Sequence, residues 1–170
     1  GIKDIEALYH KNEFTPAASK GQIIPKPGML EAYVRFIHGL VDMDKIKPLR
    51  VVVDAGNGMA GLVAPKMFEN TPIEVIPMFF EPDGSFPNHE ANPLIEENRL
   101  DLIAKVKEVK ADFGVGFDGD SDRAFFVDNN GDFIDGDFMT GRLGAYLLKR
   151  YPGSTIFYDV RGSRYVRETI

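Results

Sequence analysis

The sequence has 170 residues, of which 44% are hydrophobic and 27% are charged, a composition typical of a folded, water-soluble domain. Its formal net charge of −6 argues against general nucleic-acid binding, which requires a basic surface. No apolar run approaches the roughly 20 residues of a membrane span, and the start lacks the pattern of a signal peptide. The absence of cysteine excludes disulfides and thiolate metal sites and agrees with a reducing compartment. We therefore expect a cytoplasmic protein with one main domain that binds neither nucleic acid nor membrane.

The amino-terminal part of the chain predicts two helices separated by a connecting segment. Apolar residues recur at helical spacing over Ile2–Tyr9. Residues 14–28 are rich in proline, glycine and small side chains, which is typical of a connection, although residues 22–24 could form a short edge strand. A second helix is expected after this segment, ending before Pro48.

From residue 49 onward, short apolar runs alternate with amphipathic segments. The predicted strands are 49–53, 73–79, 112–117 and 155–158, with helices at 59–68, 99–110, 137–150 and from Ser163 onward. Residues 124–127 and 133–134 flank Asn129-Asn130-Gly131, which indicates a hairpin, and Ser163 is expected to cap the last helix. This alternation predicts an α/β fold of three layers, α/β/α, around a mostly parallel mixed sheet.

Three loops should meet at one edge of this sheet. In open α/β sheets, ligands bind beyond the carboxyl ends of the strands. The loops 54–58, 80–93 and 118–123 each follow a predicted strand and should share that edge. The functional site is therefore expected where these three loops come together.

The segment Gly114–Arg123 carries the strongest chemical signal. A short apolar strand leads into Asp118, Asp120 and Asp122, followed directly by Arg123. Three like charges at alternate positions repel one another unless a cation lies between them, and an all-oxygen ligand set suits Mg²⁺. Arg123 offers a planar fork of donors suited to a phosphoryl group beside the metal, and Gly119 is expected to allow the turn. The alternative is a solvated acidic turn.

A glycine motif supports a competing hypothesis. Residues 54–61 contain Gly-x-Gly-x-x-Gly between a strand and a helix, and Glu81 follows the next strand at the place of a ribose-binding acid. This pattern is typical of a nucleotide (NAD)-binding domain of an oxidoreductase. Against that function, Asp54 would place a carboxylate beside a pyrophosphate. The glycines could equally serve only a tight turn.

The acidic segment has features in common with two other motifs. It does not match a calcium loop, because Arg123 stands at the sixth position instead of glycine and Asn129 at the twelfth instead of glutamate. It agrees better with the start of an aspartyl-phosphate phosphatase, with Asp118 as nucleophile and Asp120 as acid or base, although Asp122 departs from that pattern. His89 is expected to be an ordinary surface histidine rather than a catalytic one.

Taken together, the ordered motifs resemble the phosphohexomutase family (phosphomannomutase/phosphoglucomutase), over almost the whole chain. The matching stretches are Asp54-Ala55-Gly56-Asn57-Gly58, Pro82-Asp83-Gly84-Ser85-Phe86-Pro87-Asn88-His89 with Asn92-Pro93, Gly116-Phe117-Asp118-Gly119-Asp120-Ser121-Asp122-Arg123, Asn130-Gly131, Gly136-Asp137, and Tyr158-Asp159-Val160-Arg161 with Ser163-Arg164. Each piece alone is weak, but the ordered set is specific and makes dinucleotide binding a minor alternative.

The resemblance implies an isomerase that interconverts hexose 1-phosphate and hexose 6-phosphate through a phosphoserine and a bisphosphate intermediate. By position, Asp118, Asp120 and Asp122 would bind Mg²⁺, and Arg123 would contact the phosphoryl group as a catalytic residue. The family has four domains, and this chain resembles the second. Residues 1–20 would then be the tail of the phosphoserine domain with a linker, 21–153 the metal-binding α/β domain, and 154–170 the start of the following domain.

One departure from the family pattern is decisive for the expected activity. The family's Thr-Ala-Ser-His-Asn-Pro stretch, which bears the phosphoserine, does not occur in this sequence. The sugar-recognition and phosphate-binding loops of the later domains do not occur either. We therefore expect the chain to need its phosphoserine and sugar-binding domains as partners and to be inactive alone. A self-contained metal-binding module remains a further alternative.

Overall fold

A single mixed sheet forms the centre of the molecule. The computed structural model describes residues 1–12 and 14–170. The strands are β1 (Leu49–Asp54), β2 (Ile73–Met78), β3 (Phe113–Phe117), β4 (Ala124–Asp128) and β5 (Phe133–Ile134). Their order is β2-β1-β3-β4-β5; β2, β1 and β3 are parallel, whereas β4 is antiparallel to both its neighbours. All strands except β4 therefore run the same way, as the prediction of a mostly parallel mixed sheet requires.

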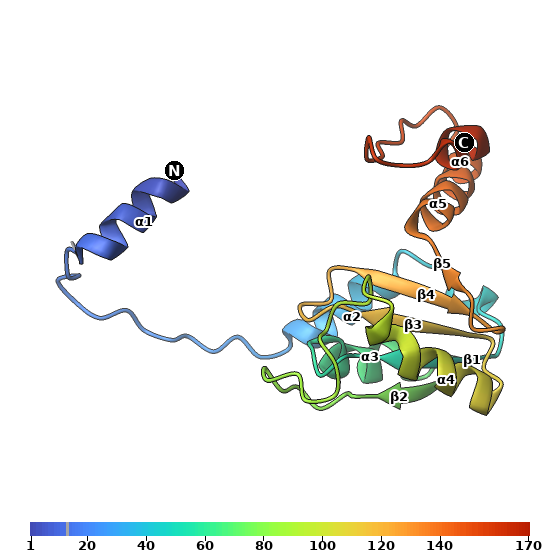
Figure 1. Ribbon diagram of the computed structural model, residues 1–170, viewed down its shortest axis with the longest axis horizontal. Helices are drawn as coiled ribbons and strands as arrows, with labels where there is room; N and C mark the ends of the chain where they lie inside the picture. The colour runs from blue at the N-terminus through green and yellow to red at the C-terminus, as the bar shows by residue number, and fades with distance from the viewer. Residues whose placement is uncertain (13) are drawn as a thin grey trace.

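Helices cover both faces of this sheet. The helices are α1 (Ile2–Lys11), α2 (Met29–His38), α3 (Ala60–Phe68), α4 (Leu100–Val109), α5 (Gly136–Arg150) and α6 (Arg164–Thr169), with short 3₁₀ turns η1 (Met43–Lys45) and η2 (Glu97–Arg99). Helix α4 packs on one face, and α3, with α2 beside it, packs on the other (Figure 1). The α/β fold and its three layers are thus confirmed.

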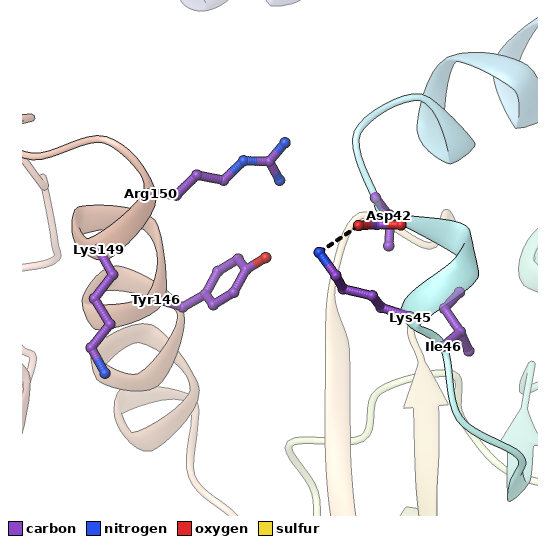
Figure 2. A pocket seen from close by; sticks show the side chains of 7 residues that line it. Asp42, Lys45, Ile46, Tyr146, Lys149 and Arg150 are labelled. Atoms are coloured by element: carbon purple, nitrogen blue, oxygen red, sulfur yellow. Dashed lines mark ion pairs between the residues drawn. The ribbon is translucent and has the colours of Figure 1, made fainter.

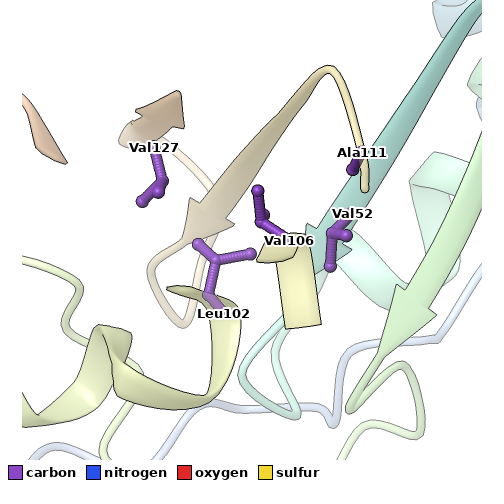
Figure 3. Packing of buried hydrophobic residues seen from close by; sticks show 5 residues of the cluster. All are labelled: Val52, Leu102, Val106, Ala111 and Val127. Carbon is purple, nitrogen blue, oxygen red and sulfur yellow. The ribbon is translucent and has the colours of Figure 1, made fainter. Parts of the chain in front are cut away.

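The face under α4 is an aliphatic core. Figure 3 shows its buried side chains, which are Val52, Leu102, Val106, Ala111 and Val127. Gly114 in β3 lies directly beneath the helix: a Cβ added there would lie 2.7 Å from Val106 Cγ2 and 2.8 Å from Leu102 Cδ1. Because Gly114 has no side chain, α4 can approach the centre of the sheet closely. This packing sets the distance between α4 and β3, the strand that carries the acidic segment.

The opposite face has a second core in which β1 meets α3. Val51, Val53 and Val115 pack with Ala64, and Phe68 and other partly buried apolar side chains surround them. Since β1 contributes alternate residues to the two cores, its run of valines is buried on both sides. The predicted central strand is confirmed for this reason.

The strand predicted at 155–158 is wrong, and the edge strand considered possible at 22–24 is not formed. Residues 22–24 and 155–158 have no strand partner, and Ile23 and Phe157 are 98% and 90% exposed. Strand propensity alone gives no sheet, because an isolated extended segment leaves its N–H and C=O groups to water. The helix expected after residue 28 also stops early, at His38, and is followed by the turn η1.

The ends of the chain lie away from the sheet. Helix α1 is joined to the body by an extended segment, and α5 and α6 pack on each other (Figure 1). The Phe138 and Tyr165 rings are 4.5 Å apart, at the contact between α5 and α6. Ser163 occupies the N-cap position of α6, but the predicted side-chain cap is wrong: its backbone N–H donates to Asp137 Oδ2 (2.6 Å). Among the described residues, no helix is both long and apolar enough to span a membrane.

Helix α3 begins in very tight contact with the loop that follows β2. A Cβ added to Gly61 would lie 1.9 Å from the Phe80 carbonyl oxygen, so the backbone would have to move. We expect Gly61→Ala to lower the free energy of unfolding by about 2 kcal/mol or more, measured by urea denaturation. The matched control is Gly136→Ala at the start of α5, where nothing lies within 4 Å of the added carbon. Equal effects of the two substitutions would contradict this packing role.

Candidate functional site

Three loops meet at the carboxyl edge of the parallel strands. They are named here the glycine loop (54–58), the cover loop (80–93) and the acidic loop (118–123). The Met59 backbone N–H donates to the Gly119 carbonyl (3.0 Å), and Asn57 Nδ2 donates to the Glu81 carbonyl (2.8 Å). The predicted common edge is confirmed by these contacts.

The acidic loop brings its three carboxylates together. One oxygen from each of Asp118, Asp120 and Asp122 lies within 4.8 Å of the other two. Asp118 is buried at the end of β3, whereas Asp120 and Asp122 are exposed. The loop is closed by register, because Phe117 and Ala124, the residues that flank it, are paired across β3 and β4.

The turn inside the acidic loop differs from the sequence expectation. The residue with left-handed backbone is Ser121 (φ 63°), not Gly119. Glycine is required instead at the contact between two loops: a Cβ on Gly58 would lie 2.6 Å from the Gly119 carbonyl oxygen and 2.9 Å from Gly119 Cα. The glycine loop therefore packs directly against the acidic loop.

Arg123 provides the positive charge that the structure places among these carboxylates. Its backbone N–H donates to Asp118 Oδ1 (3.0 Å) and its Nε donates to Oδ2 (2.7 Å), while Asp122 Oδ1 lies 3.5 Å from Nε. Burial by itself would raise the pKa of Asp118, but the hydrogen bonds and the charge of Arg123 outweigh it and lower that pKa. Asp118 is therefore held ionised, as a metal ligand must be.

The donor set is chemically suited to Mg²⁺. All three side chains offer hard oxygen ligands, and the carboxylates of Asp120 and Asp122 are exposed at the surface. Neighbouring oxygens around Mg²⁺ lie about 3 Å apart, given metal–oxygen distances of about 2.1 Å, so the side chains must close by a modest amount. Although both Asp118 oxygens already accept from Arg123, an ionised carboxylate has about four lone-pair positions, which leaves room for a cation.

Sequence reasoning missed the ion pair at the end of β1. His89 Nε2 lies 3.0 Å from Asp54 Oδ2, and the two side chains are only 9% and 3% exposed. The interpretation of His89 as a surface histidine is therefore wrong. His89 Nδ1 lies 2.9 Å from the Glu90 carbonyl, so both ring nitrogens face acceptors, an arrangement that favours the doubly protonated, positively charged ring. The available signal was Asp54, a carboxylate at a buried strand end that needs a partner.

The glycine loop has a structural role. Residues 54–58 are buried, and Gly56 N–H already donates to Asp54 Oδ1 (2.8 Å). A phosphate-binding loop must expose its backbone N–H groups to the ligand, and this one is covered by residues of the cover loop. A Cβ on Gly56 would lie 3.2 Å from Ala91 Cβ and 3.4 Å from His89 Cε1. The nucleotide-binding alternative is not favoured for this reason.

Two hollows in the surface differ in their position relative to the acidic loop. One, of about 390 Å³, adjoins the loop and is bounded by Asp120 and Ser121 on one side and by apolar residues of α2 and α3 on the other. A second, of about 610 Å³, lies between residues 41–46 and α5. Figure 2 shows the basic side chain of Lys45 in this second hollow, where it is paired with Asp42 (2.7 Å). None of the residues that line the second hollow belongs to the three loops. Of the site residues expected from the sequence, Asp120 lines the first hollow and none lines the second.

Comparison with known proteins agrees with this geometry. Residues 31–131 match the family model described as phosphoglucomutase/phosphomannomutase, alpha/beta/alpha domain II. A phosphomannomutase of Vibrio cholerae is 41% identical over 95% of this chain and 36% of its own length. A phosphomannomutase/phosphoglucomutase of Pseudomonas putida is 44% identical over 95% of this chain and 35% of its own length.

A solved structure gives the same result. The crystal structure of a phosphoglucomutase/phosphomannomutase family protein from Burkholderia thailandensis superposes with a TM-score of 0.78 at 35% identity, covering 98% of this chain and 37% of that one. The fold and the acidic edge thus define a domain of the α/β/α class found in these mutases. The chain belongs to the phosphoglucomutase/phosphomannomutase family and corresponds to its domain II. It spans about a third of the length of these relatives.

The buried His89 makes stability depend on pH. The hydrogen bonds that the ring donates to the Asp54 carboxylate and the Glu90 carbonyl, together with the charges of Asp54 and Asp101, raise the pKa of His89 to about 8 despite burial. Since the unfolded value is about 6.5, the stabilisation is fully present below about pH 6.5 and is lost as the pH rises through 8. The free energy of unfolding should fall by about 1–2 kcal/mol over this window. Denaturant titrations of wild type and His89→Gln check this, since identical pH dependence in both would contradict the assignment.

Proposed function

We propose that this chain is the Mg²⁺-binding domain of a phosphohexomutase that interconverts hexose 1-phosphate and hexose 6-phosphate, of mannose, glucose or both. The observation that carries the proposal is the convergence of Asp118, Asp120 and Asp122, with Arg123 beside them, in a chain that belongs to this family. Because phosphoryl transfer depends mainly on positioning and charge neutralisation, an acidic cradle with an adjacent guanidinium suits it.

Each residue of the acidic loop has a separate role in this proposal. Asp118 is fixed by Arg123 and supplies a preorganised oxygen, whereas the exposed Asp120 and Asp122 close on the cation. Bound Mg²⁺ would neutralise negative charge on a phosphoryl group. Arg123, which is 53% exposed, can turn its fork of donors toward that group, since its Nε is the nitrogen engaged by Asp118. The arrangement therefore offers both charge neutralisation and orientation.

The remaining machinery would come from other domains of the same protein. We infer that residues 1–20 end a phosphoserine domain and its linker, that 21–153 form the metal-binding domain, and that 154–170 begin the next domain. Helix α1, which stands apart on an extended segment with Ile2 and Ile5 83% and 67% exposed, supports this division. The serine nucleophile and the sugar-binding groups would act with this domain in the cytoplasm on a hexose phosphate substrate.

The first prediction from this proposal concerns Asp120, whose side chain is exposed. In the intact protein, Asp120→Asn should lower the turnover number for mannose 1-phosphate or glucose 1-phosphate by about a hundredfold, since a ligand charge is lost at the metal. Thermal unfolding should stay within about 2 °C of wild type. Asp132→Asn, another exposed carboxylate, is the matched control. Full activity of Asp120→Asn would contradict the metal role.

The second prediction concerns the 170-residue chain by itself. It should bind Mg²⁺ weakly and show no conversion of mannose 1-phosphate or glucose 1-phosphate, because the Thr-Ala-Ser-His-Asn-Pro stretch that we expect to carry the phosphoserine does not occur in it. Isothermal calorimetry with MgCl₂ and a coupled mutase assay measure the two properties. Tight Mg²⁺ binding would favour a self-contained metal-binding module instead, and turnover would refute the division of labour between domains.

A further inference from the structure

The Asp54–His89 ion pair lies outside the acidic loop yet is connected to it from two sides. Asp54 ends β1, and His89 lies on the cover loop. The pair joins the glycine loop to the cover loop, and its two members are among the least exposed charged side chains at this edge. Removing one partner would leave the other charge buried and uncompensated, which is strongly unfavourable.

Hydrogen bonds extend this connection along both loops. Asn88 Nδ2 donates to Asn57 Oδ1 (2.8 Å), and the Asp83 backbone N–H donates to the Asn57 carbonyl (2.9 Å). Asn57 N–H in turn donates to the Phe79 carbonyl (2.8 Å). The Phe79 ring also meets the His89 ring edge to face, with centroids 5.3 Å apart. These hydrogen bonds and the Asp54–His89 ion pair therefore hold the glycine loop and the cover loop together as one unit.

This unit touches the acidic loop at Gly119 from both sides. On one side lies Gly58, where even a Cβ would collide with the Gly119 backbone. On the other side a Cβ on Gly119 would lie 3.4 Å from the Phe86 ring and 3.7 Å from Ala91 Cβ. Since Gly119 separates Asp118 from Asp120, its position decides whether the carboxylate oxygens converge.

We propose that the Asp54–His89 ion pair is a positioning element of the active site, which holds Gly119 between Gly58 and Phe86 so that Asp118 and Asp120 face a common point. The inference rests on the proposed function, because it concerns the same metal cradle. Neither Asp54 nor His89 contacts metal or substrate; both act through the contacts at Gly119. A loss of the pair therefore affects phosphoryl transfer and Mg²⁺ binding more than sugar binding.

The test compares His89→Gln with His38→Gln in the intact protein that carries this chain. His38 Nε2 bonds the Met67 carbonyl (2.7 Å) between α2 and the end of α3, has no hydrogen bond to any of the three loops among the described residues, and is the matched control. We expect His89→Gln to lower kcat about tenfold and to raise the half-saturating Mg²⁺ concentration, with less than about a twofold change in KM for the hexose phosphate. His38→Gln should change none of these. Equal effects of the two variants, or a change in KM alone, would overturn the proposal.

Two further variants keep the proposal open to refutation if His89→Gln does not fold. Asp54→Asn combined with His89→Gln restores a neutral hydrogen-bonded pair, and it should lose no more activity than the less active single variant, because the two residues act as a unit. Phe86→Leu removes the ring contact with Gly119 without burying a charge, and it should shift kcat and Mg²⁺ dependence in the same direction by about twofold to fivefold. Additive losses in the first, or wild-type behaviour of Phe86→Leu, would refute the role.

An NMR readout separates this inference from the proposed function. In His89→Gln the amide resonances of Gly119 and Asp120 should shift, and in His38→Gln they should not, whether or not the protein is an active mutase. Wild-type protein without Mg²⁺-dependent mutase activity would refute the proposed function alone. Unchanged Gly119 and Asp120 resonances in His89→Gln would refute the positioning role while leaving the mutase proposal intact.

Discussion

Mutual repulsion among Asp118, Asp120 and Asp122 is the constraint on which the site depends, because carboxylates brought within a few ångström of one another would separate in a flexible loop. The fold opposes this repulsion in two ways. Arg123 neutralises part of the charge through its backbone N–H and its Nε, both bound to Asp118. The neighbouring loops oppose it by contact, since the backbone of Gly119 has no free space toward Gly58.

Glycines serve as spacers at each level of this arrangement. Gly114 lets α4 lie close to the sheet, Gly61 lets α3 begin against the Phe80 carbonyl, and Gly58 lets the glycine loop reach Gly119. The two cores on either side of β1 and β3 fix the strand ends from which the loops start. A pattern that resembles a dinucleotide-binding fingerprint thus serves packing in this fold, because the same residue type meets both needs.

The sequence predicted the features that depend on local pattern and failed where partners distant in the chain decide. The valines of β1, the Asn130-Gly131 hairpin and the acidic segment each carry their own periodicity or turn chemistry, and all were located correctly. Residues 22–24 and 155–158 have strand-like composition, but no neighbouring strand is available to them. His89 could not be assigned from its neighbours, because its partner Asp54 lies 35 positions away and only the fold brings them together.

The register of β3 and β4 affects the free-energy cost of binding a cation at the acidic loop. Phe117 and Ala124 are paired across the sheet, so the six residues between them form a closed connection whose ends cannot drift apart. The loss of conformational entropy that closes this segment occurs when the two strands pair during folding, before any ion binds. Binding of an ion then requires the side chains of Asp120 and Asp122 to rotate, but it does not require the backbone to become ordered. Residues inserted between Phe117 and Ala124 would lengthen this loop and raise its ordering cost, even if every acidic residue were retained.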